Sequence, residues 1–300
     1  MKKVHLLHNP TAGDKEFARN ELLSLIKSEG FECSYASVKQ EKWDEFSVDT
    51  DFLVIAGGDG TVRRIAKALM KRPRLDKQYP LALLPHGTAN NIACTLNIDG
   101  KVKDIVKSWH KSVLKKFDIG KIYGIGENVF FLEGFGCGIF PRLIKVMEKI
   151  DTEAGSIEEK IKTARSVLYD IVLTYEAQNC KIVADGITHS GKYIMVEVMN
   201  TSSIGPNLEL AKSADPGDGE LDIVMIPESH QKKFEAFLLN KINGEEEDYV
   251  FTTIKAKNVE ILWEGKDVHV DDEKIKFSLP LNVKVEIQPG MLEFLVVEEE

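Results

Sequence analysis

The 300-residue sequence has no apolar run near the roughly 20 residues that span a membrane, few cysteines and no excess of positive charge. Its four cysteines are scattered, with neither a C-x-x-C pair nor the spacing of a zinc site, which predicts reduced thiols in a cytoplasmic protein. The formal net charge of −9 argues against a nucleic-acid-binding protein, which would usually carry a basic face. Contact with a membrane stays open, because such contact can be local.

A chain of this length favours two domains, because 300 residues is long for one simple hydrophobic core. Residues 1–120 alternate strand and helix patterns, which predicts a parallel sheet covered by helices on both faces. Residues 121–290 carry short strand-like runs separated by turn residues, the pattern of an antiparallel sandwich or barrel. The last strand-like run could return to either domain, so residues 291–300 could join the first.

The apolar periodicity sets the expected elements of each domain. In the first domain we expect strands at 3–8, 32–38, 53–56 and 81–84, and helices at 14–28, 62–70, 89–96 and 102–109. In the second we expect strands at 116–123, 129–134, 181–184, 193–199, 221–226, 258–263, 268–270, 274–277 and 283–288, and helices within 140–175 and 231–239. The stretch 139–175 mixes apolar and basic residues, so it either covers a lipid groove or membrane face, or packs as ordinary helices on the second domain.

A glycine-rich turn, Gly57-Gly58-Asp59-Gly60-Thr61, directly follows the apolar strand at 53–56. A buried strand that ends in glycines and opens a helix presents bare backbone N–H groups, which suit a phosphate. One carboxylate, Asp59, lies inside this turn, where it could hold a metal ion or a reacting hydroxyl beside the phosphate. The alternative is a glycine-rich turn with an acid on the surface.

Two further polar loops follow neighbouring strands, and ligands of parallel sheets bind at such strand ends. The first loop could wrap phosphates or a ribose, or be a plain turn; its residues are Asn9, Pro10, Thr11, Ala12 and Gly13. In the second, Gly87 permits close backbone approach and Thr88 is expected to cap the next helix. Asn90 and Asn91 can tie the loops together, and His86 is a candidate acid or base that more often has no catalytic part.

Two acidic segments lie in the second half of the chain. Asp215 and Asp218, in a loop made tight by proline and glycine, offer oxygen ligands for a magnesium- or calcium-like site, or form an acidic turn without a metal. Asp271, Asp272 and Glu273 lie between two strand-like runs. One of them could act as a general base for a hydroxyl, and the alternative is a polar β-turn.

These segments, in this order, resemble the lipid kinase family of diacylglycerol, sphingosine and ceramide kinases, above all its soluble bacterial members. The motifs N-P-x-[AS]-G, G-G-D-G-T, G-T-x-N-D, D-G-x-L-D and D-G-E correspond to residues 9–13, 57–61, 87–91, 218–222 and 271–273. The resemblance covers essentially the whole chain. It implies a nucleotide-binding α/β domain beside a β-sandwich domain, with the active site between them.

The resemblance also implies roles for single residues. ATP would bind at the 9–13 loop, the 57–61 turn and the loop of Gly87, Thr88 and Asn90, and Asp59 would act through magnesium at the phosphates. Asp118 would join that magnesium network, while Asp215, Asp218 and the carbonyl of Glu220 would hold a structural magnesium. Asp271 would be the base, with Glu273 its neighbour or rival. The expected partners are ATP and a lipid presented at a membrane surface, with diacylglycerol as the default; a homodimer and a peripheral membrane position are further options.

The sequence departs from the family pattern at two positions that bear on activity. Asn91 stands where the family usually has Asp, and Asp272 stands where the D-G-E motif has Gly. Two alternatives therefore remain open. One is an enzyme of the NAD kinase type that acts on a soluble substrate, against which the D-G-x-L-D hairpin speaks. The other is a non-catalytic nucleotide- or lipid-binding member of the fold.

Overall fold

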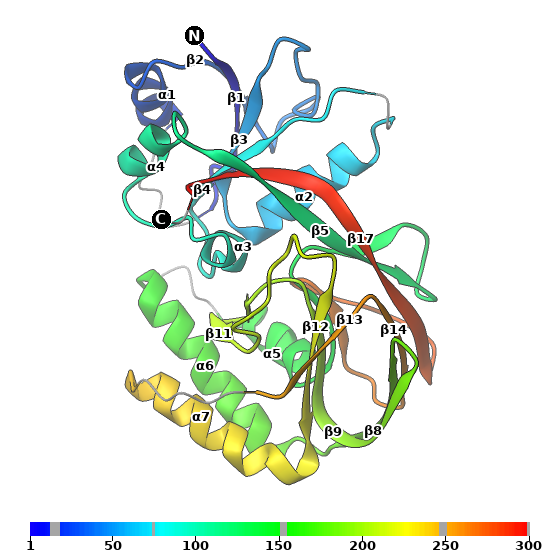
Figure 1. Cartoon of the computed structure of the whole chain (residues 1–300). Coiled ribbons are helices and arrows are strands. Elements are labelled where there is room, and N and C mark those ends of the chain that lie inside the picture. Colours follow the sequence, from blue (N-terminus) through cyan, green and yellow to red (C-terminus); the bar gives the residue numbers. More distant parts are fainter. Residues whose placement is uncertain (13–18, 74–75, 151–154, 246–250, 299–300) are drawn as a thin grey trace. The chain divides into compact units, whose positions relative to one another are not determined.

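The computed structural model of the chain describes residues 1–12, 19–73, 76–150, 155–245 and 251–298. The chain divides into two compact units, Met1–Phe117 with Gly290–Glu300, and Asp118–Pro289. Two strands, β5 (Val113–Tyr123) and β17 (Leu281–Val296), belong partly to each unit (Figure 1). The C-terminal part of β17 pairs in parallel with β4 (Leu81–Pro85), through Phe294 and Leu81, so it joins the sheet of the first unit.

The first unit is built on a parallel sheet. Its strands lie in the order β2 (Glu32–Ser37), β1 (Lys3–His8), β3 (Phe52–Gly57), β4 and β17. Every neighbouring pair in this order is parallel. All six residues of β3 are buried, as expected for the central strand of a sheet covered on both faces. The predicted α/β architecture of this part of the chain is confirmed.

The helices of the first unit cover the sheet from two sides (Figure 1). They are α1 (Arg19–Ser28), α2 (Asp59–Met70), α3 (Asn91–Thr95) and α4 (Val102–Ser108). Helices α1 and α4 bury Leu22, Ile26 and Ile105 in one hydrophobic cluster with β-strand residues, and α2 buries Val62 and Ile65 outside that cluster. Residues 14–18 of the first predicted helix lie outside the described residues.

The third helix differs from its prediction, which began at residue 89 and was capped by Thr88. The helix begins at Asn91, and its N-cap is Asn90, whose backbone is left-handed with φ 53°. The prediction was wrong because Asn90 turns its side chain back onto Gly87, accepting a hydrogen bond from the Gly87 N–H at 2.7 Å. That bond stabilises a turn at the residues where the apolar pattern indicated a helix.

The second unit is a mainly antiparallel β-sandwich with helices, as the sequence predicts. From one edge its strands run β16 (Glu273–Lys274), β15 (Val268–Val270), β7 (Gly134–Gly138), β9 (Ile187–Met199), β8 (Gln178–Ala184), β14 (Asn258–Trp263) and β17. Strand β12 (Leu221–Pro227) pairs with β9 and with β13 (Thr253–Ala256), and β6 (Val129–Phe131) pairs with β5. Strands β10 (Ser203–Ile204) and β11 (Leu208–Glu209) form a separate short pair.

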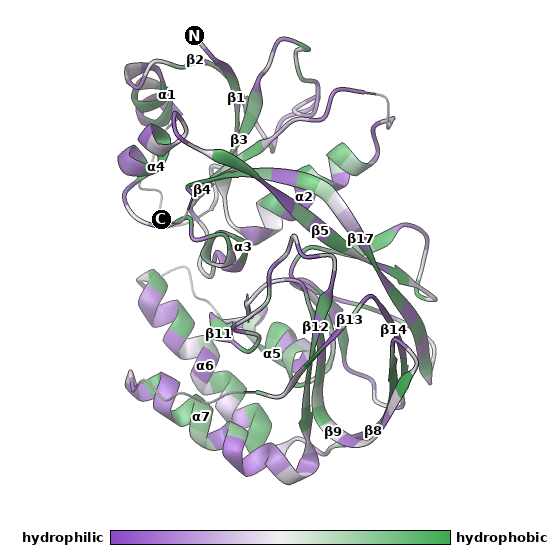
Figure 2. Cartoon of the chain, in the orientation of Figure 1, coloured by the Kyte–Doolittle hydropathy of each residue, from purple (hydrophilic) through white to green (hydrophobic). Residues whose placement is uncertain are grey.

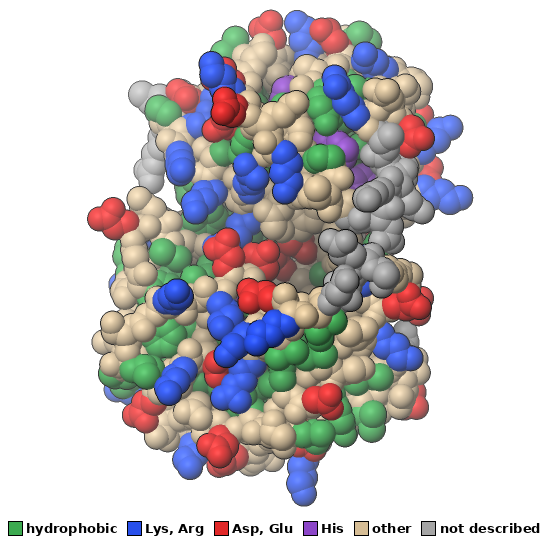
Figure 3. Space-filling model, turned by 180° about the vertical axis from the view of Figure 1, so that it is seen from behind, with side chains coloured by type: hydrophobic (Ala, Val, Ile, Leu, Met, Phe, Trp, Pro, Cys, Tyr) green, Lys and Arg blue, Asp and Glu red, His purple; other side chains and the backbone are tan. Residues whose placement is uncertain are grey.

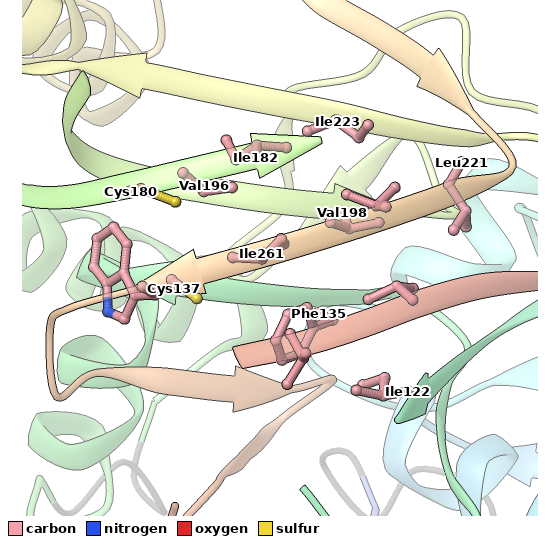
Figure 4. Close-up of a cluster of buried hydrophobic side chains, with 14 of the residues drawn as sticks. Ile122, Phe135, Cys137, Cys180, Ile182, Val196, Val198, Leu221, Ile223 and Ile261 are labelled. Atoms are coloured by element: carbon pink, nitrogen blue, oxygen red, sulfur yellow. The ribbon is translucent and has the colours of Figure 1, made fainter. Parts of the chain in front are cut away.

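One hydrophobic core fills the sandwich. Side chains from most strands of the unit meet in it, and Figure 4 shows Ile122, Phe135, Cys180, Val196 and Ile261 within this cluster. The two buried cysteines there behave as small apolar residues, because burial raises the pKa of Cys180 to about 12 and that of Cys137 well above its usual value.

Three helices cover a second hydrophobic cluster of this unit: α5 (Ile139–Met147), α6 (Ile157–Thr174) and α7 (Gln231–Asn243). They bury Phe140, Leu168 and Phe234 there together with strand residues such as Val224. Their ribbons alternate hydrophilic and hydrophobic residues, as amphipathic helices do (Figure 2). Residues 139–175 therefore include ordinary packed helices, the second of the two readings of this stretch. In the described part of the chain, no helix combines the length and apolar character needed to cross a membrane.

One face of the protein carries charges of both signs. On the face shown in Figure 3, Asp and Glu side chains lie among Lys and Arg side chains. This mixture agrees with the balance of 39 basic and 48 acidic residues in the sequence.

Several strand boundaries of the second unit were not predicted. The run 283–288 and the last strand-like run of the chain are parts of the single strand β17, and 129–134 is divided between β6 and β7. The strand expected at 274–277 keeps only Lys274, and β10, β11 and β13 were missed. These strands are short or interrupted by glycine, so their alternating pattern is weak.

Arg165 of α6 holds three backbone carbonyls from other segments. Its guanidinium donates to the carbonyl oxygens of Pro206 at 3.1 Å, Asn207 at 3.0 Å and Lys241 at 3.3 Å. We expect Arg165→Ala to lower the free energy of unfolding by about 2–3 kcal/mol, because part-buried acceptors lose a charged donor. Urea unfolding measures this change. The matched control is Lys162→Ala on the exposed face of the same helix, and an equal loss in both variants would contradict the prediction.

Candidate active site

The polar loops of the first unit meet at the carboxyl edge of its parallel sheet. Strands β1, β3 and β4 are neighbours, so the loops that follow them start side by side. Two backbone hydrogen bonds join these loop starts, from the Asn9 N–H to the Ala56 carbonyl (2.9 Å) and from the His86 N–H to the Gly57 carbonyl (3.0 Å). The starts of the three glycine- and Asn-rich segments predicted from the sequence therefore lie together at this edge.

Asn9 links the first loop to the start of α2. Its side-chain amide donates to the Thr61 hydroxyl at 3.0 Å. Its side-chain oxygen accepts from the backbone N–H of Thr11 at 3.3 Å and from the Thr11 hydroxyl at 2.9 Å. The Ala12 N–H closes the turn over Pro10 by donating to the Asn9 carbonyl at 3.1 Å. Gly13, also predicted here, lies outside the described residues.

Three glycines are required by close packing at this edge. A Cβ on Gly58 would lie 2.7 Å from the Cα of Gly87, and a Cβ on Gly87 would lie 2.5 Å from the Cα of Gly58. A Cβ on Gly57 would lie 2.5 Å from the Thr61 hydroxyl oxygen. The two loops therefore touch backbone to backbone. Gly58 is also the N-cap of α2 and has no side chain to cap the helix, so the first N–H groups of α2 point toward this edge.

Asp59 is the first residue of α2, and its carboxylate binds the start of α3. One oxygen accepts from the Asn91 N–H at 3.0 Å and the other from the Ile92 N–H at 3.1 Å. Asn91, which stands at the family's usual Asp position, is buried and takes part through its backbone. Asp59 thus connects two helix N-termini at the edge, while Thr88 lies exposed beside them.

Two histidines at this edge are held neutral. Burial lowers the pKa of His86, and the nearby His8 lowers it further; burial also lowers the pKa of His8. Near neutral pH both imidazoles therefore act as polar, uncharged groups. The edge as a whole offers backbone N–H groups, hydroxyls and amides, which are the groups that bind the phosphates and sugar of a nucleotide.

A second cluster of polar residues lies in the second unit, around the turn Asp271–Asp272 that joins β15 to β16. Asp271 is buried, with a left-handed backbone at φ 51°. Its Oδ1 accepts from the backbone N–H groups of Leu132 at 3.1 Å, Glu133 at 2.8 Å and Gly134 at 3.2 Å. Glu273, two residues on, is exposed. The predicted acidic turn is present, and its first carboxylate is fixed to the backbone.

The sequence reasoning missed two buried residues beneath this turn. Glu197 and His269 are 0% and 1% exposed, and the His269 Nε2 lies 3.0 Å from the Glu197 Oε1. The available signal was a single acid within the apolar run Ile194–Met199, because a charge there must have a buried partner.

Asp118 and the acidic loop at 215–220 come together in the second unit. The Asp118 carboxylate accepts from the Gly219 N–H at 2.7 Å, and the Asp118 N–H donates to the Pro216 carbonyl. Asp118 therefore contacts the acidic loop, and its expected part in the magnesium network of Asp59 stays a prediction.

The carboxylates of this loop bind backbone N–H groups of the same loop and a lysine. Asp215 accepts from the Gly217 N–H at 3.0 Å, and Asp218 accepts from the Glu220 N–H at 2.9 Å and forms an ion pair with Lys255. Across the described residues, no group of three or more His, Cys, Asp or Glu is placed to hold a metal ion. The structural magnesium expected at Asp215, Asp218 and the carbonyl of Glu220 stays a prediction.

Asp222, at the start of β12, provides a pH-dependent test of this loop. The residue is 1% exposed, and its Oδ1 is buried without a hydrogen-bond partner in the described part of the chain. Burial raises the pKa of Asp222 to about 6. Lys255 opposes this rise, and Asp218 and Glu220 add to it. The folded state thus favours the neutral form of Asp222. The charged form destabilises the folded protein, and this loss of stability is absent below about pH 4 and grows as the pH rises through about 6.

We therefore expect Asp222→Asn to raise the free energy of unfolding by about 1–2 kcal/mol at pH 8 and to have little effect at pH 4. Urea unfolding at both pH values, in the presence of EDTA, measures this. A destabilisation of similar size at both pH values would show that the native carboxylate has a partner at this position.

Two family models match the two units. Residues 3–122 match the diacylglycerol kinase catalytic domain, and residues 149–296 match the YegS C-terminal NAD kinase beta sandwich-like domain. The chain belongs to the diacylglycerol kinase-like family of lipid kinases. Lipid kinases are phosphotransferases. The motifs quoted for the resemblance all fall within these two matches: residues 9–13, 57–61 and 87–91 lie in the first, and residues 218–222 and 271–273 lie in the second.

Individual relatives agree with this family. The diacylglycerol kinase of Bacillus subtilis (strain 168) is 24% identical over 307 residues, covering 97% of this chain and 88% of that protein. A crystal structure from Bacillus anthracis (strain Sterne) has the same fold, with a TM-score of 0.75, 24% identity, and coverage of 98% and 95% of the two chains. The crystal structure of a diacylglycerol kinase from the same organism gives a TM-score of 0.70 at 21% identity, with coverage of 98% and 97%.

Proposed function

We propose that this protein transfers the γ-phosphate of ATP to the hydroxyl group of a lipid presented at a membrane surface, with diacylglycerol as the default acceptor. The observation that carries the proposal is the meeting of three loops at the carboxyl edge of the first sheet. There, the glycine backbones of Gly58 and Gly87 touch, and α2 begins without a side-chain cap. This edge suits a polyphosphate because backbone N–H groups and a helix dipole bind negative charge.

ATP is proposed to bind along this edge. The turn of Asn9, Pro10, Thr11 and Ala12, continued by Gly13, would follow the nucleotide's sugar and phosphates, as would the loop of Gly87, Thr88 and Asn90. The turn of Gly57, Gly58, Gly60 and Thr61 would hold the phosphates, because its backbone carries the least steric bulk. Asp59 would keep the starts of α2 and α3 in register beneath them, through its bonds to Asn91 and Ile92.

Mg²⁺ is expected to arrive bound to ATP, where it neutralises phosphate charge. The protein groups named above bind and orient the nucleotide. Phosphoryl transfer depends mainly on such positioning and on electrostatic stabilisation.

We propose Glu273, rather than Asp271, as the general base for the lipid hydroxyl. Three backbone N–H groups already occupy one oxygen of Asp271, and Leu132 also reaches the other at 3.2 Å. A carboxylate held in this way is poorly placed to take a proton from a substrate. Glu273 is exposed on β16 and is positioned by the turn that Asp271 anchors.

The proposal is tested by supplying labelled ATP and Mg²⁺ with mixed micelles of diacylglycerol, ceramide or sphingosine, and with NAD in solution. Label in a lipid, lost in the Asp59→Asn variant, supports the proposal. Label in NAD and in none of the lipids would favour an enzyme of the NAD kinase type. Tight ATP binding without transfer to any acceptor would favour the non-catalytic alternative that Asn91 and Asp272 motivate.

The contact between Gly58 and Gly87 gives a binding prediction that does not need the acceptor. We expect Gly58→Ala to weaken ATP binding about tenfold or more, because the new Cβ would push the two loops apart. Isothermal titration calorimetry measures this affinity. The control is Gly191→Ala, where a Cβ meets the Tyr193 ring at an ordinary 3.5 Å. Unchanged ATP affinity in a folded Gly58→Ala variant would place the nucleotide elsewhere.

A further inference from the structure

The Glu197–His269 pair is buried in the second unit between β9 and β15. The two residues are 0% and 1% exposed, and the His269 Nε2 lies 3.0 and 3.1 Å from the two oxygens of Glu197. Burying an acid and an imidazole costs free energy that an apolar pair would not, so their presence in this core calls for a role.

The other nitrogen of His269 contacts the Asp271 turn. Its Nδ1 lies 2.7 Å from the Asp271 carbonyl oxygen. A carbonyl oxygen can only accept a hydrogen bond, so Nδ1 must carry the proton. One further proton then lies between Nε2 and Glu197, either on a neutral acid or on an imidazolium. In both arrangements His269 is held by hydrogen bonds at both nitrogens.

The titration of the pair agrees with this arrangement. Burial raises the pKa of Glu197, against the opposing effect of His269. Burial alone would lower the pKa of His269, but Glu197 and the Asp271 carbonyl outweigh it, and the net direction is upward. Both shifts retain a proton on the pair near neutral pH.

Neighbouring residues pack closely around this pair. A Cβ on Gly136 of β7 would lie 2.0 Å from either carboxylate oxygen of Glu197, so glycine at this position leaves the space that the acid occupies. The Phe140 ring packs edge-on against His269, with 6.1 Å between ring centres. Gly136 and Phe140 therefore pack closely against Glu197 and His269.

We propose that Glu197 and His269 are positioning residues for the Asp271–Glu273 turn. Glu197 orients the imidazole, and the His269 Nδ1–H holds the Asp271 carbonyl, which keeps Asp271 in its left-handed conformation. Asp271 can then accept hydrogen bonds from the backbone N–H groups of Leu132, Glu133 and Gly134. This fixes the backbone position of Glu273, two residues further along the chain. The effect on catalysis rests on the proposed function, whereas the effect on the turn does not.

The test is amide hydrogen exchange, measured by NMR without substrate, in Glu197→Leu and Glu197→Gln. Glu197→Leu removes the partner of Nε2, and we expect exchange of the Leu132, Glu133 and Gly134 amides to rise about tenfold or more. Glu197→Gln keeps a hydrogen bond to a neutral His269, and we expect exchange within about twofold of the native protein. The ring ¹⁵N shifts of His269 should show a protonated Nδ1 in the native protein and in Glu197→Gln.

An internal control comes from a similar turn in the same unit. Asp185 also has a left-handed backbone, at φ 44°, and its carboxylate accepts from the Lys257 and Asn258 amides at 2.9 Å. Exchange at these two amides should not change in either variant. Equal acceleration at both turns, or no acceleration at 132–134 in Glu197→Leu, would overturn the proposal. If Glu197→Leu does not fold, Glu197→Asp replaces it, since the shorter acid withdraws from Nε2.

A kinetic measurement extends the test to catalysis. In Glu197→Leu we expect kcat for lipid phosphorylation to fall about tenfold or more with an unchanged KM for ATP, and Glu197→Gln to restore most of the rate. A native protein without lipid kinase activity would defeat the proposed function but leave the exchange result to decide on the positioning role. If Glu197→Leu shows accelerated exchange but a normal kcat, the pair positions the turn without affecting catalysis, and the catalytic part of the proposal is overturned.

Discussion

Asp59→Asn is expected to reduce phosphoryl transfer about 100-fold or more while the protein stays folded. The native carboxylate accepts one N–H from Asn91 and one from Ile92, one on each oxygen. Asparagine has a single acceptor oxygen and no charge, and its NH₂ group would face a backbone donor. The start of α3 should therefore shift away from α2, and the loop that contains Gly87 should move with it.

The cost in stability should be smaller than the loss in rate. Losing one of two charged hydrogen bonds at a helix start is worth about 1–2 kcal/mol. Asp185→Asn is the matched control, since Asp185 also accepts two backbone N–H groups but lies in a hairpin of the second unit. Urea unfolding and lipid phosphorylation are compared for both variants. Similar rates in Asp59→Asn and Asp185→Asn would show that Asp59 has no part in the reaction.

Asp271→Asn is expected to lower both the stability and the rate, by about 2–3 kcal/mol and about 100-fold. Three backbone N–H groups converge on one oxygen of Asp271, so removal of its charge leaves buried donors poorly satisfied. Asparagine tolerates the left-handed backbone at φ 51°, so the substitution changes the charge and leaves the conformational preference nearly as it was.

Glu273→Gln separates anchoring from proton transfer at the same turn. Because Glu273 is exposed, the free energy of unfolding of the Glu273→Gln variant should be unchanged. Its kcat should fall about 100-fold if Glu273 is the general base. Unfolding curves and kcat for Asp271→Asn and Glu273→Gln distinguish the two roles. Full activity in Glu273→Gln, with loss in Asp271→Asn, would return the base to Asp271.

The local pattern of the chain predicted the parallel sheet and the strand-end loops of the first unit, but not the start of α3. An uninterrupted apolar strand followed by Gly57-Gly58 is buried as β3 and opens α2, and the same strand–loop order at Asn9 and Gly87 indicated loops at one sheet edge. Neighbouring parallel strands end at the same edge, so chain order was enough to place these loops together.

The roles of the acids in the second unit could not be predicted from the local pattern. The sequence contains Asp271 beside Asp272 and Glu273, but their different environments depend on the 132–134 segment, which is about 140 positions away along the chain. The pairing of Glu197 with His269 likewise joins residues 72 positions apart. The local hydrophobic pattern does not indicate which strands pair with one another in an antiparallel sandwich.

The sequence by itself determined the two-part architecture, the strand-end loops of the first unit and the acidic turns of the second, because these depend on local apolar period and on turn-forming residues. Only the tertiary structure decided what the acids do. It turned Asp59 onto the start of α3, fixed Asp271 to three backbone N–H groups and paired Asp218 with Lys255. The physical reason is that a carboxylate takes its role from the donors that surround it, and those donors come from strands and helices that only folding brings near.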